Sequence, residues 1–126
     1  MTRPFTQAER ELLRRLASFG PDAPVLFDQI DVAEHDGWWF EGSQSCHIAT
    51  PTAAPQYFSG LSQGGGRQIG PGALVLSDPS SLDRLENVIG HAFFWLQDGR
   101  LSAFEYAWFT DDMPGSLPRL DQLLPH

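Results

Sequence analysis

The sequence predicts an α+β fold, with one N-terminal helix packed on a mainly antiparallel sheet that has a central C-terminal β-hairpin. Residues 90–109 form two aromatic-rich apolar runs on either side of Asp98-Gly99. This pair accepts positive φ at both central positions of a two-residue hairpin turn. Near the N-terminus, Thr6 followed by Glu9 forms a capping box, which marks the start of a helix.

The first helix is expected over residues 7–19. Leucines recur on one stripe at helical spacing, at Leu12, Leu13 and Leu16, and this stripe should face the sheet. Gly20-Pro21 should end the helix.

The next elements are predicted from alternation and from turn residues. Residues 24–34 alternate well enough for a strand, although Leu26, Phe27 and Ile30 also share a helical face, so a helix is the alternative. Further predictions are a turn at 35–37, short strands at 38–41, 45–50 and 73–77, a long loop at 51–72, a brief helix from 78 to 85, and an extended proline-containing tail after residue 109.

The predicted hairpin supplies the candidate binding residues. With Asp98-Gly99 as the whole loop, Leu96 faces Leu101 and Phe93 faces Phe104, because side chains alternate across each strand. A bulge would slip this register and exchange the faces of one strand. With the two-residue turn and no bulge, one face carries an aromatic group that is either core or a recognition surface for a ligand or partner, namely Phe93, Trp95, Phe104, Tyr106 and Trp108.

Composition limits the class of protein. A chain of 126 residues predicts a single domain spanning 1–126. The single cysteine and the absence of a signal-peptide pattern predict a cytoplasmic protein. The net charge is -8 and every basic residue is arginine, so we expect neither nucleic acid nor an anionic membrane as a partner. A basic protein fits better, with Asp111 and Asp112 as the acidic partner surface. Self-association to a homo-oligomer is compatible with this prediction.

No motif predicts catalysis, a metal or a cofactor. His35, Asp36, Cys46 and His47 are close in sequence, but the adjacent Cys46 and His47 should point to opposite faces of a strand and so not share one ion.

A nucleophilic site is not predicted either. Cys46, His91 and Asp111 are the residue types of a catalytic triad, but three such residues occur in most chains of this size, and no GxSxG motif occurs. Glu105 is expected among apolar neighbours, where a structural role is favoured over acid–base work.

The run DGRLSAFEYAWFTDDMPGSLP, at residues 98–118, resembles a recurring C-terminal segment of small uncharacterised bacterial proteins, mainly actinobacterial. The order of a leucine-bearing helix, PVLFDQI and GWWFEGSQSCHI is also similar. Some relatives carry more glycine and cysteine near the position of Cys46. The resemblance implies an α+β fold and no assigned activity.

The sequence therefore predicts a non-enzymatic, acidic protein-binding domain, of which inhibitors and immunity proteins are examples. The alternative is a small-molecule-binding domain or cryptic enzyme, with a pocket under residues 51–72 lined by the aromatic face.

Overall fold

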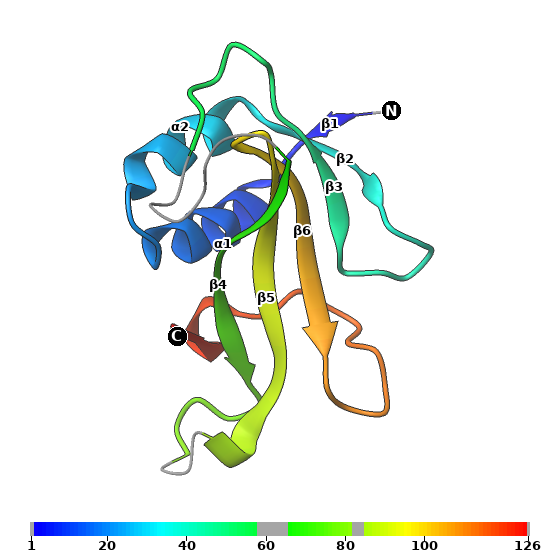
Figure 1. The fold of residues 1–126 in the computed structure, drawn as a ribbon. Helices are drawn as coiled ribbons and strands as arrows, with labels where there is room; N and C mark the ends of the chain where they lie inside the picture. Colours follow the sequence, from blue (N-terminus) through cyan, green and yellow to red (C-terminus); the bar gives the residue numbers. More distant parts are fainter. Residues whose placement is uncertain (1, 58–65, 82–84, 126) are drawn as a thin grey trace.

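The computed structural model describes residues 2–57, 66–81 and 85–125 and confirms the α+β class (Figure 1). Its helices are α1 (Gln7–Ser18) and α2 (Ala23–Val32), with short 3₁₀ turns η1 (Leu85–Asn87) and η2 (Leu120–Gln122). Its strands are β1 (Arg3–Pro4), β2 (Glu34–Trp38), β3 (Cys46–Ala49), β4 (Arg67–Leu76), β5 (Val88–Gln97), β6 (Arg100–Trp108) and β7 (Leu123–Pro125).

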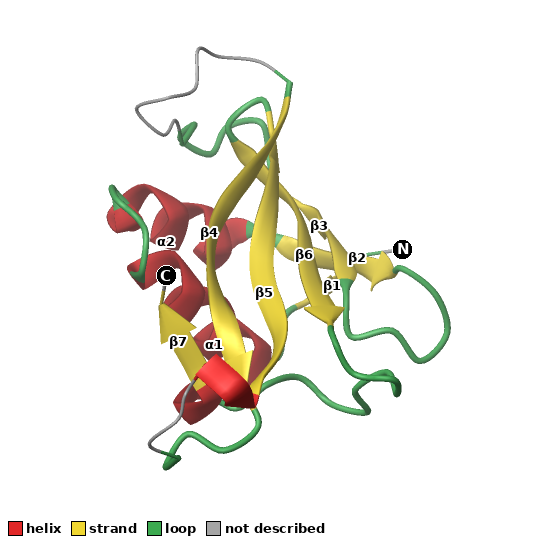
Figure 2. Cartoon of the chain, turned by 60° about the horizontal axis from the view of Figure 1, so that its bottom comes forward, coloured by secondary structure: helices red, strands yellow, loops and turns green. Residues whose placement is uncertain are grey.

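The strands form one antiparallel sheet in the order β1-β2-β3-β6-β5-β4-β7. Both helices lie on the same side of this sheet (Figure 2). Leu16 of α1 and Ile30 of α2 are fully buried there, in one cluster with Phe94 and Phe104 of the sheet. The core therefore lies between the helices and one face of the hairpin.

Helix α1 begins where the capping box predicts. The Glu9 N–H donates to Thr6 Oγ1 at 3.1 Å, and the Thr6 N–H donates to Glu9 Oε1 at 2.8 Å. Leu12, Leu13 and Leu16 are all buried. The predicted leucine stripe therefore faces the core.

The strand predicted over residues 24–34 is wrong, and the helical alternative is correct. Helix α2 occupies Ala23–Val32 and has Pro24 in its first turn, where the missing N–H leaves no helical bond unmade. Leu26 and Ile30 are fully buried beside Gln29, a spacing that only a helix places on one face. The segment therefore folds as a helix, because helical spacing buries its apolar side chains better than its incomplete apolar–polar alternation would in a strand.

Strand β2, which follows α2, is shifted from the position predicted for it. β2 covers the predicted turn at 35–37 and ends at Trp38, because Gly37, with φ of 99°, takes up an irregularity in the pairing with β3. The predicted strand at 38–41 is wrong for this reason.

Strand β4 begins inside the predicted loop of residues 51–72. Gly72 pairs with Phe93, and a Cβ on Gly72 would lie 2.5 Å from Phe93 Cβ, so glycine permits the close approach of the two strands. Part of the predicted loop, residues 58–65, lies outside the described residues. Gly72 therefore reflects the close packing of two strands and not a loop.

The extended tail predicted after residue 109 ends in an edge strand, and the brief helix predicted at 78–85 does not form at residues 78–81. This edge strand, β7, pairs with β4, and Leu123 packs against the core. Pro125 is tolerated because β7 lies at the sheet edge. In the predicted helix at 78–85, Asp78 instead accepts hydrogen bonds from the N–H and hydroxyl of Ser80; residues 82–84 lie outside the described part of the chain.

The hairpin turn is confirmed, but its register changes after two pairs. Asp98 and Gly99 have φ of 52° and 77°, as a two-residue turn of this type requires. Gln97 pairs with Arg100 and Leu96 with Leu101, but Trp95 then pairs with Ala103. Ser102 is therefore the extra residue of a β-bulge, and every later side chain of β6 lies on the face opposite to the predicted one.

A buried glutamine joins α2 to this hairpin. The side chain of Gln29 is fully buried, and its Nε2 donates to the carbonyl oxygens of Pro55 at 2.7 Å and Gly99 at 2.9 Å. Its Oε1 accepts from the Leu101 N–H at 2.9 Å. One amide thus satisfies three backbone groups from two segments distant in sequence.

Replacing Gln29 should destabilise the fold strongly. We expect Gln29→Ala to lower the free energy of unfolding by about 2–4 kcal/mol in urea denaturation, because buried backbone groups lose their partners and a cavity remains. Gln29→Glu should also destabilise at pH 7, since an ionised carboxylate cannot donate to the two carbonyls, and should recover in part at acidic pH. The matched control is Gln56→Ala, which removes an exposed bond to the Asp98 carbonyl. Equal effects of the two alanine variants would contradict the role of Gln29.

Candidate functional site

The predicted aromatic group does not form one surface. Phe104 and Tyr106 are buried and face the helices, whereas Phe93 and Trp95 lie on the opposite face of the sheet. Trp108, near the end of β6, is 38% exposed. The bulge at Ser102 causes this division, because the prediction assumed a regular register along the whole hairpin.

The sheet face without helices carries a connected layer of side chains. The Arg67 guanidinium lies 4.0 Å from the centroid of the Trp95 ring, and Trp95 Nε1 donates to Glu105 Oε1 at 2.8 Å. Phe93 is buried beside Trp95, and its ring stacks on His91 at 4.6 Å. Glu105 is thus paired with an indole on this face, in keeping with the structural role favoured above.

A groove of about 310 Å³ lies at the far end of β6. One wall is the segment that follows β2, with Trp39, Phe40 and Ser45. The other wall is the end of β6, including Glu105, Tyr106 and Trp108. Phe40 is 50% exposed, and Trp39 Nε1 is buried without a hydrogen-bond partner among the described residues. The groove is therefore largely apolar.

Strand β6 presents a backbone edge to this groove. β3 pairs with β6 only at Ala103 and Phe104, and β6 continues to Trp108. The Tyr106 N–H points to the β3 side, where it donates to Ser45 Oγ at 2.9 Å, and the Phe109 N–H points to β5 and donates to the Ile89 carbonyl. Backbone groups alternate along a strand, so those of Trp108 point toward the groove side.

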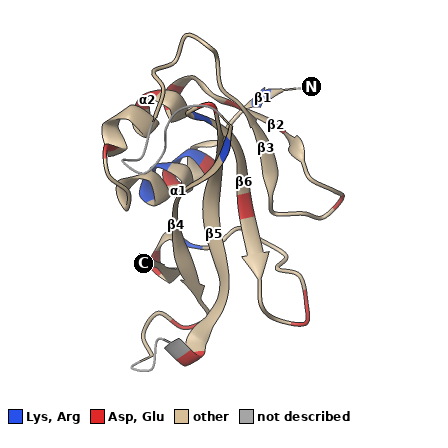
Figure 3. Cartoon of the chain, in the orientation of Figure 1, with Lys and Arg blue, Asp and Glu red and all other residues tan. Residues whose placement is uncertain are grey.

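Exposed carboxylates lie in the two chain segments that adjoin the groove. Asp111 and Asp112 are exposed in the segment that follows β6, and Glu41 is exposed in the opposite wall segment. No arginine or lysine occurs in residues 39–45 or 105–118, and Figure 3 shows red without blue on both segments. Met113 reaches to 3.5 Å from the Cβ position of Gly42 and so links the two.

Trp39, Phe40 and Ser45 were not predicted from the sequence as binding residues. Trp38, Trp39 and Phe40 are three consecutive large aromatic side chains, and a strand can bury only alternate ones on a single face. This excess of aromatic residues was the available signal for an exposed surface.

The residues considered for metal binding or hydrolysis do not assemble into one site. Cys46 is buried and His47 is exposed on the opposite face of β3, as their adjacency predicts. His91 lies on the face away from Cys46. Among residues 2–57, 66–81 and 85–125, no three His, Cys, Asp or Glu side chains are grouped so as to hold a metal ion. Burial raises the pKa of the Cys46 thiol to about 12, so this thiol is not an activated nucleophile.

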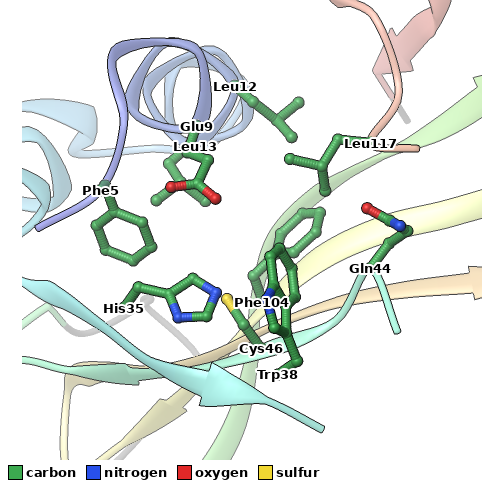
Figure 4. Close-up of a pocket in the computed structure, with 10 residues that line it drawn as sticks. All are labelled: Phe5, Glu9, Leu12, Leu13, His35, Trp38, Gln44, Cys46, Phe104 and Leu117. Atoms are coloured by element: carbon green, nitrogen blue, oxygen red, sulfur yellow. The ribbon is translucent and has the colours of Figure 1, made fainter. Parts of the chain in front are cut away.

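Cys46 lies in a second hollow, a cleft between α1 and strands β2 and β3 (Figure 4). The Glu9 carboxylate at its wall accepts from Arg3 Nη1 at 2.8 Å and from Arg3 Nη2 at 2.9 Å. These bonds, with the Thr6 N–H, lower the pKa of Glu9 to about 2. Burial, followed by the nearby Arg3 charge, lowers the pKa of His35. At pH 7, therefore, Glu9 is ionised and His35 is neutral.

The pocket expected under residues 51–72 is not lined by the aromatic group. Two described hollows adjoin this segment: one lies between Gly20, Tyr57, Ile69 and Pro71, and the other lies between α2 and residues 51–55, with Asp28 and Asp31 in its wall. The Tyr57 hydroxyl donates to the Pro21 carbonyl at 2.9 Å and so ties the segment to the end of α1. Neither hollow contains any of the five predicted aromatic residues.

The Arg3–Glu9 pair should make stability depend on acid. The pKa of Glu9 is lowered from 4.5 to about 2, so its contribution is complete above pH 4.5 and disappears as the pH falls toward 2. Glu9→Gln keeps a capping-box residue but removes the charge. It should lower the free energy of unfolding by about 1–2 kcal/mol at pH 7. This range is smaller than the full pKa shift of Glu9 would give, because solvent screens the partly exposed Arg3 charge.

Urea denaturation of both proteins from pH 7 to pH 2 tests this. The difference between them should shrink below pH 4.5 and vanish near pH 2. Asp31→Asn, which breaks an exposed pair with Arg14, should show little effect at any pH. A Glu9→Gln effect that does not change with pH would contradict the prediction.

No helix in the described part of the chain is long and apolar enough to cross a membrane. No protein-family model, curated protein or solved structure matches the chain. The candidate site is therefore defined by the geometry and chemistry of this chain alone.

Proposed function

We propose that the protein is a non-enzymatic binding domain that holds a basic, extended segment of another protein in the groove beside β6. The observation that carries this proposal is the combination of an apolar groove with a backbone edge, next to two chain segments that carry exposed carboxylates and no basic residue. Small acidic inhibitors and immunity proteins act in this general way, by covering a basic partner surface.

The backbone edge favours an extended partner. An added strand could bond to the β6 backbone groups at the groove side, as in other cases of strand addition. Main-chain bonding supplies affinity in such complexes, and the side-chain pockets supply selectivity.

The aromatic walls and the carboxylates favour arginine and lysine side chains. A guanidinium binds well over an indole or phenyl ring, and Phe40 and Trp108 offer such rings. Asp111, Asp112 and Glu41 would attract the same cations and speed their approach. Binding should therefore weaken as salt is added, because exposed charges are screened.

The alternative of a small-molecule domain with a pocket under residues 51–72 has less support. One hollow described there is lined mainly by glycine and proline, the other includes Asp28 and Asp31 of α2, and neither contains a residue of the predicted aromatic group. We therefore do not place the principal function at that end of the molecule.

Binding can be tested with a synthetic peptide in which arginine alternates with threonine, against the same peptide with glutamate in place of arginine. We expect saturable binding of the arginine peptide alone, with at least a tenfold loss between roughly 20 and 300 mM salt. Trp108→Ala should weaken binding about tenfold, as removal of a central aromatic anchor does.

Charge variants provide the matched control. Asp111→Asn with Asp112→Asn should weaken binding about threefold to tenfold at low salt. Asp28→Asn with Asp31→Asn removes the same charge from α2, away from the groove, and should have a smaller effect. Equal losses in the two double variants, or binding of both peptides alike, would refute the groove as the site.

A further inference from the structure

The sheet face opposite the helices, called the open face below, presents an apolar patch to solvent. Helices α1 and α2 both lie on the other side of the sheet (Figure 2). On the open face, Trp95 of β5 pairs with Ile69 of β4, and Phe93 of β5 pairs with Glu105 of β6. Directly paired residues point to the same side of a sheet. Ile69 is 62% exposed, so a large apolar side chain projects from this face next to an indole.

Two opposite charges flank Trp95 without pairing with each other. The Arg67 guanidinium lies 4.0 Å from the centroid of the indole ring, and Glu105 Oε1 accepts from the indole Nε1 at 2.8 Å. Neither Arg67 nor Glu105 belongs to an ion pair within residues 2–57, 66–81 and 85–125. A guanidinium has several N–H donors, and a carboxylate can accept several hydrogen bonds. Both groups therefore keep bonding capacity for a partner.

This arrangement of charge selects a second copy of the chain as that partner. A purely acidic surface would repel Glu105, and a purely basic surface would repel Arg67. In a two-fold symmetric dimer the same patch meets itself, so a contact between Arg67 of one copy and Glu105 of the other is formed twice. A two-fold axis close to Trp95 would bring both pairs together. The open face is therefore complementary in charge to itself.

The net charge of the chain points to the same face. At -8, two copies repel each other wherever their acidic surfaces approach. Around Trp95, by contrast, one guanidinium balances one carboxylate. Contact through the open face therefore avoids most of the repulsion that other contacts between copies would meet.

The size of the open face sets the strength of the expected contact. Its three long strands, β4, β5 and β6, have 10, 10 and 9 residues. At a spacing of about 4.8 Å between strands and about 3.3 Å per residue, they cover on the order of 400 Å². A standard interface buries about 800 Å² per partner. The dimer is therefore weak and forms at high protein concentration.

We propose that a second copy of the chain docks on the open face, as a two-fold symmetric dimer in which Arg67 of each copy pairs with Glu105 of the other. Trp95 and Ile69 supply the apolar contact between the two pairs. This inference goes beyond the proposed binding of a basic segment. Glu105 also lines the β6 groove, but the dimer forms without a peptide and is measured without one.

The test is sedimentation equilibrium of Arg67→Glu and Glu105→Arg, each alone and in an equimolar mixture. Each variant alone places like charges together twice, so the dimer dissociation constant should rise at least roughly tenfold above that of the unmodified chain. The mixture restores opposite charges at both contacts. It should form a heterodimer with a dissociation constant within roughly fivefold of the original. Nonspecific damage to either variant would not produce this recovery.

The matched controls make the same charge changes on the helices, on the other side of the sheet. Arg14→Glu and Asp31→Arg each alter one member of an exposed pair, and each should dimerise as the unmodified chain does. If Arg14→Glu weakened the dimer as much as Arg67→Glu, net charge and not the open face would govern association, and the proposal would be wrong.

A further variant tests the apolar part of the open face. Glu105→Arg loses the bond from the Trp95 indole, whereas Ile69→Ser changes an exposed side chain and leaves that bond in place. Ile69→Ser should raise the dimer dissociation constant roughly tenfold, as loss of an interface anchor does. An unmodified chain that stays monomeric up to about 1 mM, where even small interfaces associate, would overturn the proposal. So would an unchanged dimer in both Arg67→Glu and Ile69→Ser.

Discussion

Strand β6 needs hydrogen-bond partners along its edge facing away from β5, and β3 is too short to supply them all. β3 pairs with β6 at only two positions. Near the hairpin turn, side chains replace the missing strand: Gln29 Oε1 accepts from the Leu101 N–H, and Thr50 Oγ1 donates to the Leu101 carbonyl at 2.7 Å. The packing of α2 on the hairpin depends on this substitution.

At the other end of β6, the edge that faces away from β5 is hydrogen-bonded only in part. Ser45 Oγ takes the Tyr106 N–H, and the strand then continues to Trp108 along the groove. The incomplete pairing that requires a buried glutamine at one end thus leaves a backbone edge at the other. Aromatic side chains and carboxylates are gathered at the open end, and this asymmetry of β6 underlies the proposed binding of a basic segment.

Local signals in the sequence predicted local structure well. The Thr6–Glu9 capping box, the leucine stripe of α1 and the Asp98-Gly99 turn depend on neighbouring residues alone, and all three are confirmed. The register beyond the turn depends on Ser102 forming a bulge, which no local pattern indicated. The glycines of β4 were equally misleading, because their role is set by the partner strand.

The candidate site was predicted only in part for the same reason. Trp108 lines the groove, and Asp111 and Asp112 are exposed in the segment that follows it, but the Phe104 and Tyr106 side chains are buried in the core because of the bulge. In the cleft, Glu9 of α1 meets His35 and Cys46 of the consecutive strands β2 and β3, which lie far from it in sequence. Their proximity follows from packing α1 on the sheet, and spacing in the sequence does not encode it.

Amide hydrogen exchange measured by NMR tests the account of β6 most directly. Leu101 lies two residues beyond the turn, yet its N–H should exchange only on global unfolding, because Gln29 holds it in the core. The Trp108 N–H, at the groove edge, should exchange at least roughly 100-fold faster in the free protein. Rapid exchange at Leu101, or protection of Trp108 equal to that of Leu101, would contradict the account.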